Sequence, residues 1–195
     1  MEKKTVQKLA AVLRFLVILV FGINLLCLLL VPGLAGLLAE GGPEKLMRYL
    51  VQEVANGYAA HTLGHVGMYF MVAFVGVWKN GETAFLTLFF WGCGACTAVI
   101  LWQAKMVLDT ILKKEPFQMA NALALKRAAV CCWVISAGAL VRLILWIWWT
   151  GNIYPLFTYT ALFVPAFFMA GLLFLVMSAL FRQAAELKED QDLTI

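Results

Sequence analysis

Residues 10–31 read AAVLRFLVILVFGINLLCLLLV, an apolar stretch long enough to cross a bilayer as one helix. Three further runs of the same kind occupy residues 84–104, 128–149 and 154–181. Apolar residues make up 64% of the chain and charged residues only 13%, and the mean hydropathy of +0.89 lies outside the range of soluble domains. The chain is therefore expected to be an integral membrane protein.

The four runs predict an all-α fold. They are rich in Gly, Ala and Leu and lack the alternation of a membrane β-strand, which favours helices over a barrel. We expect a single four-helix membrane domain over residues 1–195, with an exterior segment at 32–83, a cytoplasmic loop at 105–127 and a cytoplasmic tail at 182–195. The first run is longer than the apolar part of a signal peptide, so it is expected to stay in place as an anchor.

The distribution of Lys and Arg predicts the orientation, because these residues are retained on the cytoplasmic side. With both termini in the cytoplasm, only Lys45, Arg48 and Lys79 lie outside, and Arg142 lies within the membrane. The remaining basic residues are all cytoplasmic: Lys3, Lys4, Lys8, Arg14, Lys105, Lys113, Lys114, Lys126, Arg127, Arg182 and Lys188. A fifth span at 62–78 would weaken this bias. We therefore expect that apolar stretch to lie on or dip into the outer side of the bundle, with a fifth span as the alternative.

The exterior segment contains a predicted interfacial helix. Pro43 suits a first helical turn, and Leu46, Leu50 and Val54 then recur on one face. Such an amphipathic helix lies in the membrane interface.

Two histidines follow this helix. His61 and His65 stand four residues apart and share one face of a helix, which makes them weak candidates for metal binding. No acidic residue accompanies them locally. Hydrogen bonds to backbone or lipid headgroups are the leading interpretation, and no metal or cofactor is expected.

The cysteines divide by expected depth. Cys27, Cys93 and Cys96 should lie in the outer half of the membrane, and Cys131 and Cys132 near the inner end of the third span. The Cys93–Cys96 pair is similar to the pair that four-helix membrane thiol oxidoreductases use to pass electrons to quinone. Those enzymes also need a shuttle pair in an exterior loop, which residues 32–83 lack. Thiols in helix packing are the leading interpretation, and redox activity through Cys93 and Cys96 is the enzymatic alternative.

Few polar side chains fall inside the spans. Arg142 has two interpretations: its stem carries the guanidinium toward the outer interface, beside Trp146, or it binds an anionic ligand or lipid. Asn24 and Gln103 are expected to form hydrogen bonds between helices. This scarcity of polar groups disfavours a transporter or channel subunit, which is the third functional alternative.

Aromatic residues at one connection and small residues within the spans indicate how the helices contact the membrane interface and one another. Aromatic residues flank the connection at 150–153 and predict a tight hairpin anchored at the outer interface: Trp146, Trp148, Trp149 and Tyr154. Small residues such as Gly92, Gly94 and Gly138 permit close helix packing, against another span or against a second copy of the chain.

The cytoplasmic side carries a recognisable pattern. A helical continuation of the second span is expected over 106–112, with a helix stop at Pro116 and a second helix start near Met119. The chain reads KKEPF at 113–117, followed by Asn121 and by LKR at 125–127, and it ends on DLTI at 192–195. This combination resembles the bacterial membrane-protein family catalogued as domain of unknown function 2975, over residues 84–195, with residues 33–83 outside the resemblance. By implication the signature positions are Glu115, Pro116, Phe117, Asn121, Asp192, Leu193, Thr194 and Ile195.

The resemblance implies a four-helix protein of the bacterial inner membrane, often encoded beside a small helix-turn-helix regulator, and it implies no enzymatic role. The leading hypothesis is a non-enzymatic sensor or regulatory partner of such a regulator, in contact with membrane lipid and without direct contact to nucleic acid. The acidic tail has two expected uses. It binds the regulator, or it docks on the basic residues of its own loop.

Overall fold

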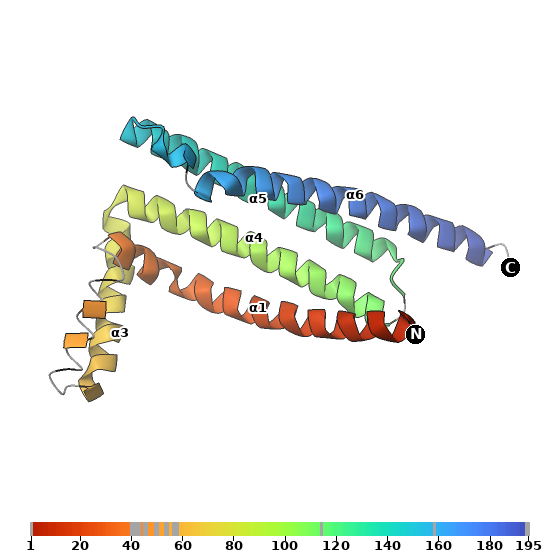
Figure 1. Ribbon diagram of the computed structural model, residues 1–195, viewed down its shortest axis with the longest axis horizontal. Coiled ribbons are helices and arrows are strands. Elements are labelled where there is room, and N and C mark those ends of the chain that lie inside the picture. The colour runs from red at the N-terminus through yellow and green to blue at the C-terminus, as the bar shows by residue number, and fades with distance from the viewer. Residues whose placement is uncertain are drawn as a thin grey trace. The chain divides into compact units, whose positions relative to one another are not determined.

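The computed structural model describes residues 2–39, 44, 47–48, 51–52, 55, 59–113, 115–157 and 159–193. Within these ranges the chain is helical and contains no strand, so the predicted all-α fold is confirmed. The elements are α1 (Glu2–Ala39), α3 (Ala59–Gly76), the short helix η1 (Val77–Lys79), α4 (Gly81–Leu112), α5 (Met119–Thr150), η2 (Tyr154–Phe157) and α6 (Tyr159–Leu193) (Figure 1).

Four helices are long and apolar enough to cross a membrane, by length and composition. They are Gln7–Gly36, Gly81–Leu112, Met119–Thr150 and Ala161–Gln191. The apolar helix Phe70–Lys79 is shorter than a span. Large apolar side chains are exposed along all four long helices, as a lipid-facing surface requires. The structure thus agrees with a multi-pass membrane protein whose four spans are those expected from the sequence.

The chain forms two compact units. The first combines Met1–Leu25 with Cys93–Ile195, and the second is Leu26–Gly92. The long helices α1 and α4 each contribute to both units.

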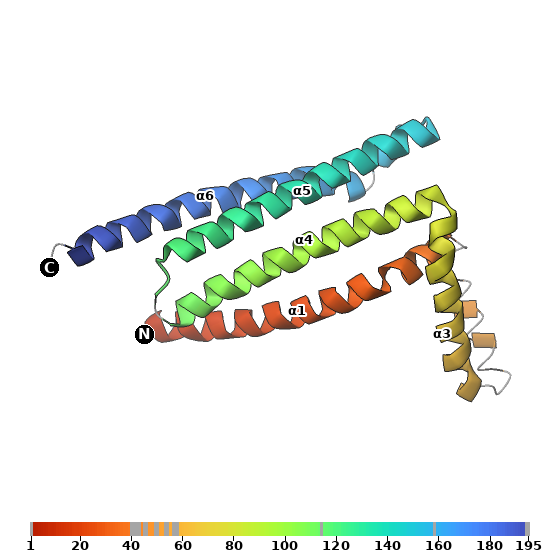
Figure 2. The ribbon, with the colours of Figure 1, turned by 180° about the vertical axis from the view of Figure 1, so that it is seen from behind.

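In the first unit α5 and α6 lie antiparallel and side by side, as the two opposite views show (Figures 1 and 2). A Cβ atom at Gly171 of α6 would come within 2.5 Å of the Trp133 indole of α5, so only glycine fits this contact. The Ser136 hydroxyl donates to the carbonyl of Val164 at 2.8 Å, next to Pro165 in α6. Close backbone approach and this interhelical bond hold the hairpin together.

The turn between α5 and α6 has the tight form expected from its aromatic flanks. Gly151 adopts a left-handed conformation with φ 62°, and its N–H donates to the Ile147 carbonyl at 2.9 Å. This is a glycine cap, in which the missing Cβ removes the steric penalty of positive φ. Trp148 and Tyr154 on either side of the turn are exposed, which suits side chains that anchor at a membrane interface.

Also in the first unit, the N-terminal part of α1 pairs with α4. The Phe21 and Trp102 rings lie 5.9 Å apart, and the Lys105 ammonium stands 4.7 Å from the centre of the Trp102 ring. That last distance is typical of a cation–π contact.

In the second unit α1 continues to Ala39, past the predicted end of the span at Val31. Pro32 lies inside the helix and lacks the N–H that would bond the carbonyl four residues earlier, which belongs to Leu28. The Trp91 indole N–H donates to that carbonyl at 2.9 Å. A distant side chain therefore replaces the missing bond, and the helix passes through the proline.

Beyond Pro32, two glycines let α1 approach α3 closely. A Cβ at Gly33 would collide with the Phe70 ring, and a Cβ at Gly36 would collide with the Ala73 carbonyl. Pro32 and Ala73 are buried at this crossing. The stretch 62–78 is thus a helix, α3 followed by η1, that packs against the end of α1.

Most of the predicted interfacial helix over 44–54 lies outside the described residues. Within it, the Arg48 guanidinium and the Glu44 carboxylate are 4.0 Å apart at helical i,i+4 spacing.

Candidate functional site at the connection between α4 and α5

The end of α4 is closed by two backbone hydrogen bonds. The N–H of Lys113 donates to the Asp109 carbonyl at 3.1 Å, and the N–H of Glu115 donates to the Thr110 carbonyl at 3.0 Å. The second bond spans five residues, as in a Schellman-type helix end. Pro116 follows directly and disfavours a helical conformation at the residue before it.

Asn121 fastens the start of α5 to this helix end. Its side-chain amide donates to the Thr110 hydroxyl at 2.6 Å and to the Pro116 carbonyl at 2.7 Å, and the residue is only 1% exposed. The Thr110 hydroxyl donates in turn to the Val107 carbonyl at 2.7 Å. Since each bond in such a chain polarises the next, the arrangement fixes the connection more firmly than separate bonds would.

A further bond lies at the surface of the connection, where the Gln118 amide donates to a Glu115 carboxylate oxygen at 2.6 Å. We call Thr110, Glu115, Pro116, Gln118 and Asn121 the connection cluster.

The connection cluster is tied to α6. The Phe117 and Phe181 rings lie 5.9 Å apart at 47°, and the Ser178 hydroxyl donates to the Ala122 carbonyl at 2.7 Å in a buried position. The end of α6 thereby has a fixed register against the start of α5.

Arg14 of α1 meets Asp109 of α4 one residue before the cluster. Arg14 Nε and Asp109 Oδ1 lie 2.7 Å apart, and the two side chains are 43% and 31% exposed. Both atoms are screened from solvent, although the angle is not that of a linear hydrogen bond, so the contact is an ion pair. With this pair, all four long helices are connected at the end of the first unit that carries both chain termini (Figures 1 and 2).

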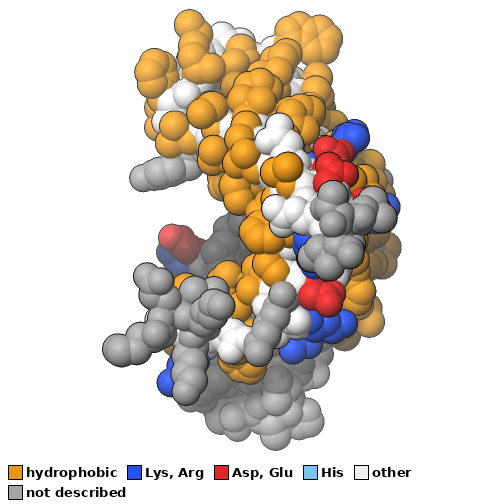
Figure 3. Space-filling model, turned by 90° about the vertical axis from the view of Figure 1, so that its right-hand side faces the viewer, with side chains coloured by type: hydrophobic (Ala, Val, Ile, Leu, Met, Phe, Trp, Pro, Cys, Tyr) orange, Lys and Arg blue, Asp and Glu red, His pale blue; other side chains and the backbone are white. Residues whose placement is uncertain are grey.

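Charged side chains gather at this end. Figure 3 views it and shows basic and acidic groups together between larger hydrophobic areas. Lys113, Lys126 and Arg127 are exposed. Glu186 of the tail accepts a hydrogen bond from Arg182 of its own helix at 2.8 Å, so this carboxylate pairs within α6 rather than with the loop.

A family model described as Protein of unknown function (DUF2975) matches residues 3–195. The chain belongs to this family. The match covers essentially the whole chain, so the expectation that residues 33–83 lie outside the family is wrong. No curated protein and no solved structure matches the chain.

The structure brings together four of the signature positions implied by the DUF2975 resemblance. Pro116 and Asn121 share a hydrogen bond, Glu115 bonds Gln118, and Phe117 contacts α6. Asp192 and Leu193 belong to the last turn of α6, and their side chains lie outside the described ones, as do Thr194 and Ile195 altogether.

Sequence reasoning missed two parts of this site. Thr110 carries no pattern that distinguishes it from other threonines. Asp109 could have been noticed, because it is the one acidic residue between Glu82 and Glu115. It follows the second apolar run, and the first apolar run contains the basic residue Arg14. A charge in such a position needs a partner.

The expected division of the cysteines by membrane depth stays a prediction. Cys131 lies well inside α5, which begins at Met119. Cys93 and Cys96 are free thiols.

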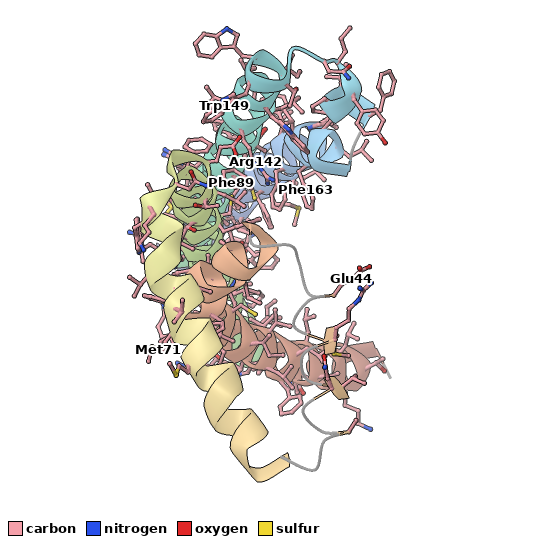
Figure 4. The ribbon with its side chains drawn as sticks, turned by 90° about the vertical axis from the view of Figure 1, so that its left-hand side faces the viewer. Glu44, Met71, Phe89, Arg142, Trp149 and Phe163 are labelled. Atoms are coloured by element: carbon pink, nitrogen blue, oxygen red, sulfur yellow. The ribbon has the colours of Figure 1, made fainter. Side chains whose placement is uncertain are left out.

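Arg142 is half-buried on α5, about two turns from Trp149 (Figure 4). It makes an interaction within the chain, which leaves both of its interpretations open. His61 and His65 belong to α3, but their side chains lie outside the described ones. Among the described residues no group of three His, Cys, Asp or Glu side chains could hold a metal.

Proposed function

We propose that this protein is a non-enzymatic sensor or regulatory protein of the bacterial inner membrane, and that its cytoplasmic face binds a small helix-turn-helix transcription regulator. The face consists of the connection cluster and the last turns of α6. The choice of partner rests on the family resemblance, which implies that such proteins are often encoded beside a small helix-turn-helix regulator.

One observation carries the proposal: α6 continues past the contact between Phe117 and Phe181, and its described side chains are exposed from Glu186 on. Phe181 contacts Phe117, after which α6 extends to Leu193, about three further turns. Its side chains from Glu186 to Gln191 are exposed, and Leu187 is 64% exposed among charged neighbours. An exposed helix with an apolar side chain is a common ligand for a groove on a partner protein.

The charge of this helix fits such a partner. Residues 182–195 contain Arg182 and Lys188 but four acidic residues, Glu186, Glu189, Asp190 and Asp192. DNA-binding proteins carry a basic face for phosphate. The acidic helix is complementary to that face, so binding would compete with promoter binding and link the membrane protein to transcription.

The test is an affinity pulldown from the native host, with partners identified by mass spectrometry. The bait is wild type, Leu187→Asp, or a chain lacking Asp190–Ile195, and Gln183→Asp is the matched control that adds the same charge one turn earlier. A helix-turn-helix regulator recovered with wild type and the control, and lost with the other two, supports the proposal. Equal recovery with Leu187→Asp, or promoter binding that is identical with and without the membrane protein, contradicts it.

The orientation is part of the proposal and has its own test. Fusions to the C-terminus should give an active fluorescent protein and an inactive alkaline phosphatase, since the phosphatase needs export. The reverse pattern would place the connection cluster outside the cell and exclude an intracellular regulator as its partner.

A further inference from the structure

An apolar groove of about 230 Å³ lies between α1 and α4 in the first unit. Its lining comes from one face of each helix: Val17, Ile18 and Phe21 of α1, and Leu101, Trp102 and Lys105 of α4. Ile18 is 45% exposed and Trp102 48%, so the groove opens to the surface that faces lipid. Its volume is below the usual range of about 300–1,000 Å³ for a small-molecule site. An open groove of this size suits part of one hydrocarbon chain.

A single cation stands at the end of this groove. Lys105 is the one charged side chain among the described residues that line it. The preceding residues 83–104 carry no charge and form about 33 Å of helix, close to the roughly 30 Å of hydrocarbon in a bilayer. The Lys105 ammonium is therefore at the level of the lipid headgroups.

This ammonium is held in place without a carboxylate partner. It stands 4.7 Å from the centre of the Trp102 ring, which itself lies 5.9 Å from the Phe21 ring. Asp109, four residues on, would be the usual partner on a helix, but its Oδ1 lies 2.7 Å from Arg14 Nε. Within the described part of the chain no carboxylate pairs with Lys105.

A ligand can reach this ammonium. Lys105 is partly exposed, and its Nζ is not among the shielded side-chain atoms that lack a partner in the described residues. An ammonium has three donors, and the contact with the Trp102 ring leaves donors for an oxyanion.

From the groove and this cation we propose a binding site for an anionic phospholipid of the phosphatidylglycerol type. One acyl chain lies in the groove, and the phosphate accepts a hydrogen bond from the Lys105 ammonium. A zwitterionic lipid fits less well, because the cation of its own headgroup offsets the charge of its phosphate. The site is separate from the proposed partner protein, and it does not depend on the orientation of the chain, since both membrane surfaces carry phosphates.

The test uses the purified full-length protein in nanodiscs of phosphatidylcholine. The probes are phosphatidylglycerol and phosphatidylcholine with the same diazirine-bearing acyl chain, each added at the same low mole fraction. Labelled peptides are mapped by mass spectrometry. We expect phosphatidylglycerol to label segments 17–21 and 101–105 about fivefold more than phosphatidylcholine does, the factor expected for one basic residue at an anionic headgroup.

Charge variants test the cation. Lys105→Gln keeps most of the stem and should reduce the labelling ratio to about one, whereas Lys105→Arg keeps the charge and should retain the preference. Lys113→Gln is the matched control, because Lys113 is exposed just after α4 and does not line the groove. It should leave the ratio unchanged.

A second pair of variants tests the groove. Ile18→Trp fills it and should reduce labelling there by both probes, whereas Ile23→Trp, at an exposed position of α1 outside the lining, should not. Equal labelling by the two probes, or a preference that survives Lys105→Gln, would overturn the proposal. An equal loss in Lys113→Gln would do so too, because it would indicate attraction to the general surface charge. Cross-links to a second copy of the chain in place of lipid labels would also overturn it.

Discussion

The bond between Trp91 and the Leu28 carbonyl leads to a quantitative prediction. Trp91→Phe removes the donor and leaves a carbonyl that Pro32 has already deprived of its helical partner. Leaving such a group unsatisfied costs about 1–3 kcal/mol, and water cannot take over the bond within the hydrocarbon. The smaller phenyl ring adds a packing loss, because the Trp91 indole also lies 6.2 Å from the Trp78 ring.

Pro32→Ala separates these two contributions. Alanine restores an N–H that reaches the Leu28 carbonyl, so Trp91→Phe should then cost only its packing loss. The two substitutions should therefore couple by about 1 kcal/mol, within the range found for hydrogen bonds in membrane proteins. The assay is the free energy of unfolding in mixed lipid and detergent micelles for wild type, both single variants and the double variant.

Trp102→Phe is the matched control for this cycle, because Trp102 lies in the other unit and contacts Phe21 rather than the Leu28 carbonyl. Its effect should be the same with Pro32 and with Ala at that position. Additivity of Trp91→Phe and Pro32→Ala to within about 0.3 kcal/mol would refute the argument that the indole replaces the proline's missing bond.

Three further substitutions test other contacts by the same unfolding assay. Asn121→Ala removes both bonds of the buried amide and should destabilise the protein by about 1–3 kcal/mol, with faster amide exchange at the connection; unchanged exchange would contradict its role there. Gly36→Ala places a Cβ against the Ala73 carbonyl and should cost about 1–3 kcal/mol, and a neutral effect would mean that the helices separate easily. Asp109→Asn removes the charge that faces the partly exposed Arg14 and should cost less, about 1 kcal/mol at most, with a smaller difference at high salt.

The number and type of the long helices could be predicted because hydropathy alone determines them. Every backbone group in the bilayer needs an internal partner, which leaves helices as the solution for long apolar runs without alternation. The ends of α4 and α5 at their connection needed a second signal, because hydropathy reports only where the lipid ends. Pro116 predicts a helix stop before it and a helix start near Met119, and α4 does end at Leu112 and α5 does begin at Met119. The bonds from Asn121 that fix this connection could not be predicted.

The end of α1 shows a different limit. A proline usually marks the end of a helix, and nothing near Pro32 in the sequence indicates otherwise. The group that satisfies the freed carbonyl is Trp91, far along the chain. Contacts of this kind depend on the tertiary structure, so the sequence pattern alone predicts the wrong end for the helix.

The candidate site was half predictable for a similar reason. The resemblance pointed to Pro116, Phe117 and Asn121, but their roles depend on partners in other helices, Thr110 and Phe181. A sequence pattern identifies which residues are unusual, and only the packing shows what each one holds in place.

The polar side chains buried in the structure affect the stability of the helix packing. Thr83, Thr87, Asn121, Ser136 and Ser178 each donate a hydrogen bond to a protein oxygen, as buried polar groups do. Asn24 Oδ1, Gln103 Oε1 and Trp133 Nε1 depart from this pattern, since all three atoms are shielded from solvent and have no hydrogen-bond partner. The bonds that are formed stabilise the packing of the helices, whereas each unsatisfied atom costs stability.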